Sequence, residues 1–251
     1  MPDQLVDVEI ADGIGVVTLA DPAHRNALSK RLSDQLSDVV AQVVDGGADV
    51  LVLQAEPPVF CSGGSLDGLL NPSHGLAEMY AGFLALAAAP IPTIAAVAGP
   101  AIGAGVNLPL ACDVVLAGES ARFDPRFLDL GIHPGGGHLW RLARRIGEQG
   151  AAALVLCGDA LTGREAEQRG LAWRCVADAD LDELAMRFAR KVAGRSTELV
   201  RRTKQTLRET VPLSEVSDAV RIELAAQEWS MEQDDFRQRV QALRERIGAR
   251  R

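Results

Sequence analysis

The sequence has no apolar run long enough to cross a membrane. Its longest apolar stretches, residues 83–89 and 91–98, are interrupted by Pro90, Pro92 and Gly99, well short of the roughly 20 residues that a membrane-spanning helix needs. The N-terminus also lacks the basic start and apolar run of a secretory signal. We therefore expect a cytoplasmic protein without a membrane span.

Cysteine is scarce, and the four residues of this type lie far apart in the sequence. No C-x-x-C pair occurs, so the spacing predicts neither a zinc site nor a disulfide framework. Isolated cysteines of this kind are typical of small, buried apolar positions. They are Cys61, Cys112, Cys157 and Cys175.

Several catalytic signatures are missing. None of the three lysines follows a glycine, which excludes a P-loop, and no serine lies in a G-x-S-x-G turn. His133 and His138 lie five residues apart without flanking acids, so we predict no metal site there. Gly103 and Gly105 begin a dinucleotide fingerprint, but Leu108 replaces its third glycine. The pattern favours neither nucleotide hydrolysis nor an esterase triad.

Basic residues are fewer than acidic ones, 26 against 34, which gives the 251-residue chain a net charge of −8. This balance argues against nucleic acid or an anionic membrane surface as a partner. The acid excess lies in residues 1–180, with 22 acids and 11 bases, whereas residues 181–251 hold 12 acids and 15 bases. The C-terminal part is therefore a different kind of segment.

Strand and helix patterns alternate up to about residue 180. Residues 6–10 and 16–19 predict a hairpin, and Ser29 caps a predicted helix that ends at Gly46. Further strands are expected at 49–54, 92–97 and 114–117, and helices at 76–88, 103–111 and 125–130. Such alternation indicates a layered α/β core. The later pattern is helical only, at 181–193, 197–210, 213–231 and 234–247.

Two glycine-rich turns, at residues 59–66 and 99–107, each lie between an expected buried strand and an apolar helix. Small residues at a helix N-terminus leave backbone N–H groups open to a ligand. Two such groups that converge on one oxygen make an oxyanion hole. For either turn alone, the better explanation is that its glycines simply allow a tight turn.

Taken together and in order, the motifs resemble the enoyl-CoA hydratase/isomerase family, the crotonase superfamily. The resemblance covers most of residues 10–180. It rests on Pro22-x-x-x-Asn26-Ala-Leu28, residues 60–66, 91–99 and 103–105 followed by Cys112-Asp113, and residues 121–123, 131–137, 158–166 and 170–172.

The resemblance implies an α/β fold, a crotonase-like spiral of ββα units, in residues 1–195. It implies that residues 196–251 form an all-helical region through which trimers assemble, often stacked as hexamers. The implied ligand is an acyl-CoA thioester, so that coenzyme A is part of the substrate and no cofactor is tightly bound.

The resemblance also assigns site residues. The oxyanion-hole N–H groups would be those of Ser62 and Ala104, which would stabilise an enolate at the thioester oxygen. The implied substrate-binding residues are Arg25, Ala27, Ser62, Gly63, Gly64, Ser65, Leu66 and Gly105.

The chain departs from the family at Ser65, where an aspartate is common, and at two catalytic positions. Family hydratases activate water with two glutamates, and these positions are Asn107 and Phe127 here. An amide can orient water but is no general base, and a phenyl ring offers only an apolar wall. His133, whose imidazole ring can act as a general base, and Asp129 are the candidate bases. Asp124 is expected to cap the helix at 125–130 and to be a weak base.

Three functional interpretations remain open from the sequence. The first is an enoyl-CoA hydratase-like enzyme, a lyase or isomerase of fatty acid metabolism, for which isomerisation with a single base is as plausible as hydration. The second is an acyl-CoA-binding family member without catalysis. The third is a thioesterase or decarboxylase, for which no serine or cysteine nucleophile has a visible base.

Overall fold

The structure, a computed structural model, describes residues 4–70 and 74–248. The chain divides into two compact units, Met1–Ala193 and Gly194–Arg251. Within the described ranges, no helix is long and apolar enough to cross a membrane.

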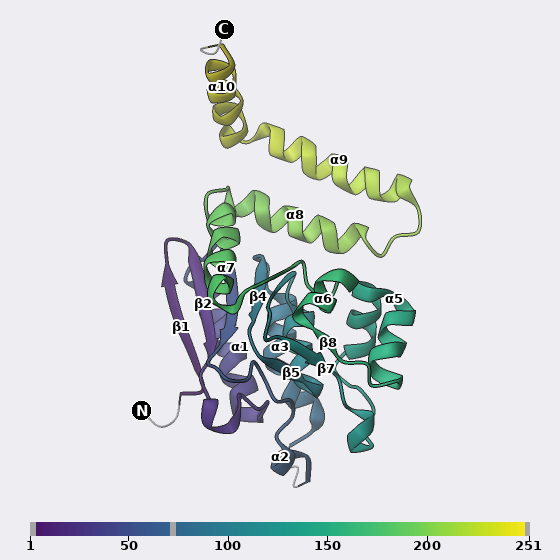
Figure 1. Cartoon of the computed structure of the whole chain (residues 1–251). Helices are drawn as coiled ribbons and strands as arrows, with labels where there is room; N and C mark the ends of the chain where they lie inside the picture. The colour runs from purple at the N-terminus through teal and green to yellow at the C-terminus, as the bar shows by residue number, and fades with distance from the viewer. Residues whose placement is uncertain (1–3, 71–73, 249–251) are drawn as a thin grey trace. The chain divides into compact units, whose positions relative to one another are not determined.

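The N-terminal unit is organised around a six-stranded sheet (Figure 1). At one edge β1 (Val6–Ala11) and β2 (Ile14–Leu19) form the predicted antiparallel hairpin. The strands beyond β2 pair in parallel. In spatial order they are β3 (Val50–Ala55), β4 (Thr93–Val97), β6 (Val114–Gly118) and β9 (Arg174–Val176).

Helices cover both faces of this sheet, as the apolar runs of its parallel strands require. Leu51 and Leu53 of β3 belong to the core cluster that includes α1 (Lys30–Asp45) and α3 (Ala81–Ala88). Val50 and Val52 point to the opposite face and pack with α7 (Asp178–Ala193). The predicted cap of α1 is confirmed, because the Ser29 side chain accepts a hydrogen bond from the Leu32 N–H at 3.1 Å. The expected α/β class is therefore correct.

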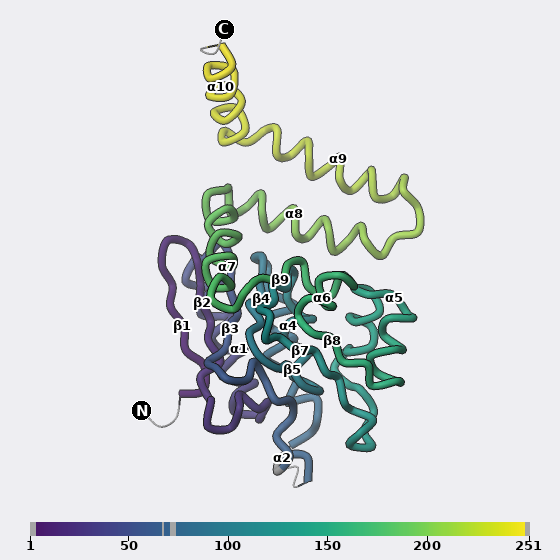
Figure 2. The backbone as a smooth tube through the Cα atoms, viewed as in Figure 1, coloured from purple at the N-terminus to yellow at the C-terminus, as the bar shows by residue number. Residues whose placement is uncertain are grey.

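A second, three-stranded sheet consists of β5 (Pro100–Ile102), β7 (Arg122–Asp124) and β8 (Leu161–Thr162). The tube of Figure 2 shows α4, which follows β5, inside the N-terminal unit. The remaining elements of this unit are short helices and one long one. They are η1 (Pro22–His24), α2 (Leu66–Leu70), η2 (Leu76–Tyr80), η3 (Gly103–Val106), α4 (Asn107–Ala111), η4 (Leu128–Leu130), α5 (His138–Leu156) and α6 (Gly163–Arg169).

The helix expected at 125–130, with Asp124 as its cap, is not formed. Asp124 ends strand β7, and only the 3₁₀ turn η4 follows. The carboxylate of Asp124 pairs instead with Arg122, at 3.4 Å from its Nε, and with Arg126. The Asp124 carboxylate does not cap a helix because it pairs with these two arginines, each two residues away in the sequence. A further expectation fails at Cys157, which is exposed, while Cys61 and Cys112 are buried.

The C-terminal unit contains α8 (Thr197–Thr210), α9 (Val216–Glu232) and α10 (Asp234–Gly248). These helices match the predicted ones, apart from a later start of α9. Figure 1 shows α8 and α9 running antiparallel beside one another, as their contacts also indicate.

Candidate active site

Backbone hydrogen bonds join the first glycine-rich turn to the segment that precedes α1. The Ser62 N–H donates to the Arg25 carbonyl at 3.0 Å, the Leu28 N–H donates to the Gly63 carbonyl at 2.7 Å, and the Ser65 N–H donates to the Leu28 carbonyl at 3.0 Å. The two segments therefore run in parallel, with an isolated bridge between Leu28 and Gly64. Residues 25–28 and 62–65 form one wall of the candidate site.

Asn26 fixes this wall from inside. It is fully buried and left-handed, with φ 52°. Its Nδ2 donates to the carbonyls of Glu56 at 3.0 Å and Val59 at 2.8 Å, and its Oδ1 accepts from the Asp21 N–H at 2.8 Å. Asparagine tolerates this backbone conformation better than most residues. Asn26 is thus structural, and it leaves the neighbouring Arg25 exposed.

The second turn lies directly against the first. The Ile102 N–H donates to the Cys61 carbonyl at 2.9 Å, and the Cys61 N–H donates to the Pro100 carbonyl at 3.1 Å. A Cβ at Gly63, where φ is +95°, would lie 2.7 Å from the Ile102 oxygen and 3.6 Å from the Ala104 nitrogen. A Cβ at Gly105 would lie 2.5 Å from the Cys61 oxygen. Glycine is required at both positions because the backbones approach so closely.

The backbone N–H groups of the two turns are not equally free. Ala104 is the second residue of the 3₁₀ helix η3, so its N–H lies in the first turn and has no acceptor within the helix. The Ser62 N–H, in contrast, already donates to Arg25. In the described part of this turn, the Gly64 N–H has no backbone acceptor. Geometry therefore favours Gly64 over Ser62 as the amide that could act with Ala104.

Asn107 and His138 meet behind the second turn, although 31 residues separate them in the sequence. His138 is the first residue of α5 and is only 1% exposed, and Asn107 is equally buried. The His138 Nδ1 lies 2.9 Å from the Asn107 Oδ1, and the Asn107 Nδ2 donates to the Gly135 carbonyl at 3.3 Å. His138 was not among the predicted site residues.

The rings around His138 are apolar. Phe127 packs against the imidazole with ring centroids 5.0 Å apart and an interplanar angle of 67°. A Cβ at Gly136 would lie 2.5 Å from the Phe83 Cζ and 3.4 Å from the Asn107 Nδ2. The Phe83 ring therefore lies close to the Asn107 side chain. Burial lowers the pKa of His138 to about 4, and the charge of Arg141 acts in the same direction. The imidazole is therefore neutral at pH 7.

The two candidate bases predicted from the sequence are both exposed, unlike His138. His133 is exposed, and its Nδ1 lies 2.8 Å from the Pro134 carbonyl oxygen. Asp129 is exposed in η4, where Arg126 is its charged neighbour. Asn107 and Phe127, the positions that the resemblance gives to the family glutamates, do come together, and they do so around His138.

The remaining predicted binding residues lie along the first turn. Ser65 is half-buried, and its Oγ accepts from the Gly68 N–H at 3.4 Å at the start of α2, while Leu66 is 62% exposed. Ala27 is half-buried beside Asn26. Cys61 is fully buried, which raises the pKa of its thiol to about 12. This turn therefore offers backbone amides and apolar surface rather than a charged nucleophile.

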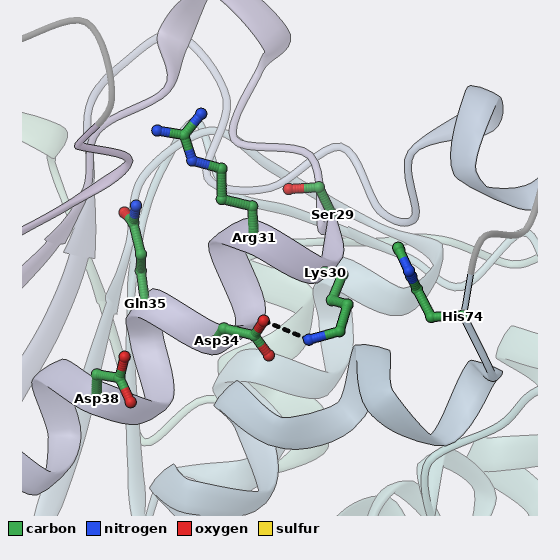
Figure 3. A pocket seen from close by; sticks show the side chains of 7 residues that line it. All are labelled: Ser29, Lys30, Arg31, Asp34, Gln35, Asp38 and His74. Atoms are coloured by element: carbon green, nitrogen blue, oxygen red, sulfur yellow. Dashed lines mark hydrogen bonds and ion pairs between the residues drawn. The ribbon is translucent and has the colours of Figure 1, made fainter.

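A separate hollow of about 430 Å³ lies over α1. Figure 3 shows Lys30 and Asp34 joined within it, with Ser29 and His74 at the same rim. None of the predicted site residues lines it. Within residues 4–70 and 74–248, no three histidine, cysteine or acidic side chains gather as a metal-binding group.

Comparison with known proteins decides the family. The family model described as enoyl-CoA hydratase/isomerase matches residues 9–249. The chain belongs to this family. A Mycobacterium tuberculosis protein named probable enoyl-CoA hydratase is 38% identical over 93% of this chain and 94% of its own length. The enoyl-CoA hydratase/isomerase fold is also evident in the crystal structure of a Bacillus anthracis enoyl-CoA hydratase. That structure matches with a TM-score of 0.91, 27% identity and 97% coverage of both chains.

A second solved structure of a similar protein contains a ligand. The Thermobifida fusca structure solved in complex with CoA matches with a TM-score of 0.83 and 27% identity, over 92% of this chain and 94% of that one. The resemblance to the crotonase superfamily and the mixed α/β fold with a C-terminal helical region are thereby confirmed. The main feature of this enoyl-CoA hydratase/isomerase family member that the sequence did not predict is the buried contact of His138 with Asn107.

Proposed function

We propose that the protein binds acyl-CoA thioesters and stabilises an enolate of the bound thioester. The proposal rests above all on the two glycine-rich turns, which lie against each other so closely that a Gly63 Cβ would be 3.6 Å from the Ala104 nitrogen. The names of the relatives, and the CoA complex of the Thermobifida fusca protein, support CoA thioesters as the ligand class.

The thioester oxygen would accept hydrogen bonds from the N–H groups of Ala104 and Gly64. The Ala104 amide is free because it begins η3, and the Gly64 amide has no backbone acceptor. Such preorganised donors act where charge develops in the transition state, and one of them typically contributes ~2.7–4 kcal/mol. Ser62 would keep its N–H on Arg25 and support the turn.

Two-glutamate hydration has no counterpart in this site. Asn107 and Phe127 carry no carboxylate, and both are buried against His138. A reaction that proceeds through an enolate without two acids therefore fits the site better. Isomerisation of a 3-enoyl thioester to the conjugated 2-enoyl thioester is such a reaction.

Binding and turnover test the proposal separately. Calorimetric titration of the purified chain with hexanoyl-CoA, a saturated thioester, is expected to give saturable binding. Incubation with 3-hexenoyl-CoA and with 2-hexenoyl-CoA then shows which reaction occurs. Absence of thioester binding would overturn the proposal as a whole. Binding without turnover of either substrate would leave the non-catalytic acyl-CoA-binding protein as the correct reading.

We also propose that the C-terminal unit mediates assembly into trimers or dimers of trimers. Large apolar side chains are exposed along α8, α9 and α10, which an isolated soluble helix bundle rarely shows. They include Leu207, Val216, Val220, Leu224, Leu243 and Ile247. A second and third copy of the chain would cover them.

A further inference from the structure

His138 carries an unused hydrogen-bonding atom. Among the described residues of the N-terminal unit, its Nε2 is the single buried side-chain nitrogen or oxygen that has no hydrogen-bond partner. Leaving such an atom unpaired in a protein interior is energetically unfavourable. An unpaired atom of this kind, on a side chain that is 1% exposed, indicates a partner that arrives with a ligand.

The hydrogen-bond network decides which form of the imidazole is present. The Asn107 Nδ2 donates to the Gly135 carbonyl, so the Asn107 Oδ1 is the atom that faces the His138 Nδ1. This oxygen can only accept, and therefore the Nδ1 carries the hydrogen. The Nε2 then presents its lone pair. His138 is consequently held as a neutral hydrogen-bond acceptor.

Asn107 and His138, which we call the dyad, are joined directly to the proposed oxyanion hole through the backbone. Asn107 follows η3 and donates its backbone N–H to the Ala104 carbonyl. Three residues of 3₁₀ helix span about 6 Å along the axis, so the free Ala104 amide and the Asn107 side chain lie about that far apart along the chain axis. A thioester held at Ala104 would thus bring its acyl carbons towards the part of the site that His138 occupies.

We propose that His138 is the catalytic base of a one-base double-bond isomerisation, with Asn107 as the residue that positions it. This inference rests on the proposed function, since it requires an acyl-CoA thioester bound at the glycine-rich turns. The substrate class it names is the 3-enoyl-CoA thioester, in which the double bond is separated from the carbonyl by one carbon.

This isomerisation moves one proton from Cα to Cγ and needs no other reactant. The His138 Nε2 takes a proton from Cα, the Cα–H electron pair moves into the conjugated system, and the thioester oxygen carries the negative charge of the dienolate. The electrons then return through the chain, Cγ takes the proton from Nε2, and the double bond ends between Cα and Cβ. The neutral imidazole is restored, and neither water nor an oxidant is consumed.

The surroundings of His138 favour proton return over exchange with water. Phe127 packs its apolar ring against the imidazole, and the Phe83 ring lies close to Gly136, two residues before His138. The charged group that acts on it is Arg141 of α5, whose Nη1 donates to the Gly136 carbonyl at 2.6 Å. The other titratable side chain close by is Tyr80, whose hydroxyl adjoins Gly135. None of these groups is a second base.

The basicity of the imidazole is sufficient for the task. Burial lowers the pKa of His138 to about 4, close to the ordinary glutamate value of about 4.3. At neutral pH the group is therefore unprotonated and as basic as the carboxylate that the family uses. It reaches this state without placing a negative charge next to the enolate.

The decisive experiment follows a label through the reaction. With 3-hexenoyl-CoA deuterated at Cα, the wild-type full chain is expected to form 2-hexenoyl-CoA with part of the deuterium at Cγ. His138→Gln should lower kcat by about 10²–10⁴-fold, while the Kd for hexanoyl-CoA changes by less than about threefold. His24→Gln, an exposed histidine outside the site, serves as the matched control and should isomerise at the wild-type rate.

The outcomes separate this inference from the proposed function. Loss of hexanoyl-CoA binding by the wild-type chain would overturn the proposed function. Binding with full isomerase activity in His138→Gln, or activity lost in His133→Gln instead, would overturn the assignment of His138 alone. Wild-type binding without isomerisation would overturn the assignment of His138 together with the proposed enolate reaction, and would leave acyl-CoA binding standing.

Asn107 has its own test. Asn107→Asp would place a carboxylate at the His138 Nδ1, which should raise the pKa of the imidazole and move the acid limb of the rate profile upward by about 1–3 pH units. Asn107→Leu should lower kcat without a matching change in hexanoyl-CoA affinity. A rate profile of Asn107→Asp that coincides with the wild-type profile would exclude Asn107 as a positioning residue.

Discussion

Phe127 meets His138 edge to face, with the ring centroids 5.0 Å apart. Phe127 occupies the position that the resemblance gives to a family glutamate, and its ring packs against the imidazole whose Nδ1 contacts Asn107. The imidazole thus has an amide partner and an aromatic wall, and no carboxylate to stabilise its charged form. The folded protein should resist protonation at this residue.

The free energy of unfolding should therefore decrease as the pH is lowered through a range set by the pKa values of His138. Its pKa is about 4 in the folded chain and about 6.5 in an unfolded chain. As the pH falls below 6.5, the unfolded state gains this proton first, so the free energy of unfolding decreases until the pH passes about 4. The contribution lost is about 3 kcal/mol. Urea unfolding of wild type and His138→Gln at pH 7, 5.5 and 4.5 measures it, and parallel pH curves would contradict the prediction.

Gly63→Ala should destabilise the N-terminal unit. The new Cβ would lie 2.7 Å from the Ile102 carbonyl oxygen, at a residue with φ +95°, and such backbone strain costs about 1–3 kcal/mol before the contact is relieved. Gly64→Ala is the matched control for stability, since its Cβ would meet only Leu69 at 3.6 Å or more. Equal melting temperatures of the two variants would show that the turns are less tightly apposed than described.

Ala104→Pro tests the free amide of η3. Proline removes the N–H, and it is tolerated in the first turn of a helix. We expect turnover of 3-hexenoyl-CoA to fall by about 10²–10³-fold. Ala104→Gly, which keeps the N–H, should remain within a few-fold of wild type. Circular dichroism confirms that the proline variant is folded, and full activity of that folded variant would remove Ala104 from the oxyanion hole.

Leu224→Glu tests the proposed assembly through the C-terminal unit. Leu224 is 50% exposed on α9, and a charge buried between subunits is strongly unfavourable. Light scattering after size-exclusion chromatography should show wild-type trimers or hexamers and smaller species for the variant. Glu228→Gln on the same helix should keep the wild-type mass. A monomeric wild type would end the proposal.

Local patterns predicted the local elements well. The hairpin of β1 and β2 and the cap of α1 at Ser29 follow from signals within a few residues, and the structure has both. The cap expected at Asp124 failed because the carboxylate pairs with Arg122 and Arg126. Helix propensity alone does not weigh such competing partners.

The site was harder to predict because its partners are distant in sequence. His138 and Asn107 lie on different helices, and periodicity does not report which helix start faces which side chain. One signal was present: His138 directly follows three glycines at the start of a helix, a place where small residues let a ligand approach the backbone N–H groups. Burial, which cannot be read from the residues beside it in the sequence, is what lowers the pKa of this histidine and leaves it neutral at pH 7.

The buried thiol of Cys61 has a consequence for the chemistry that the protein can tolerate. A 2-enoyl thioester is a Michael acceptor, and it would form beside a turn that contains a cysteine. Because burial raises the pKa of Cys61 to about 12, its thiol is protonated at pH 7 and the reactive thiolate is scarce. If the proposed isomerisation takes place, the close packing of the two turns would therefore protect the protein from alkylation by the 2-enoyl thioester.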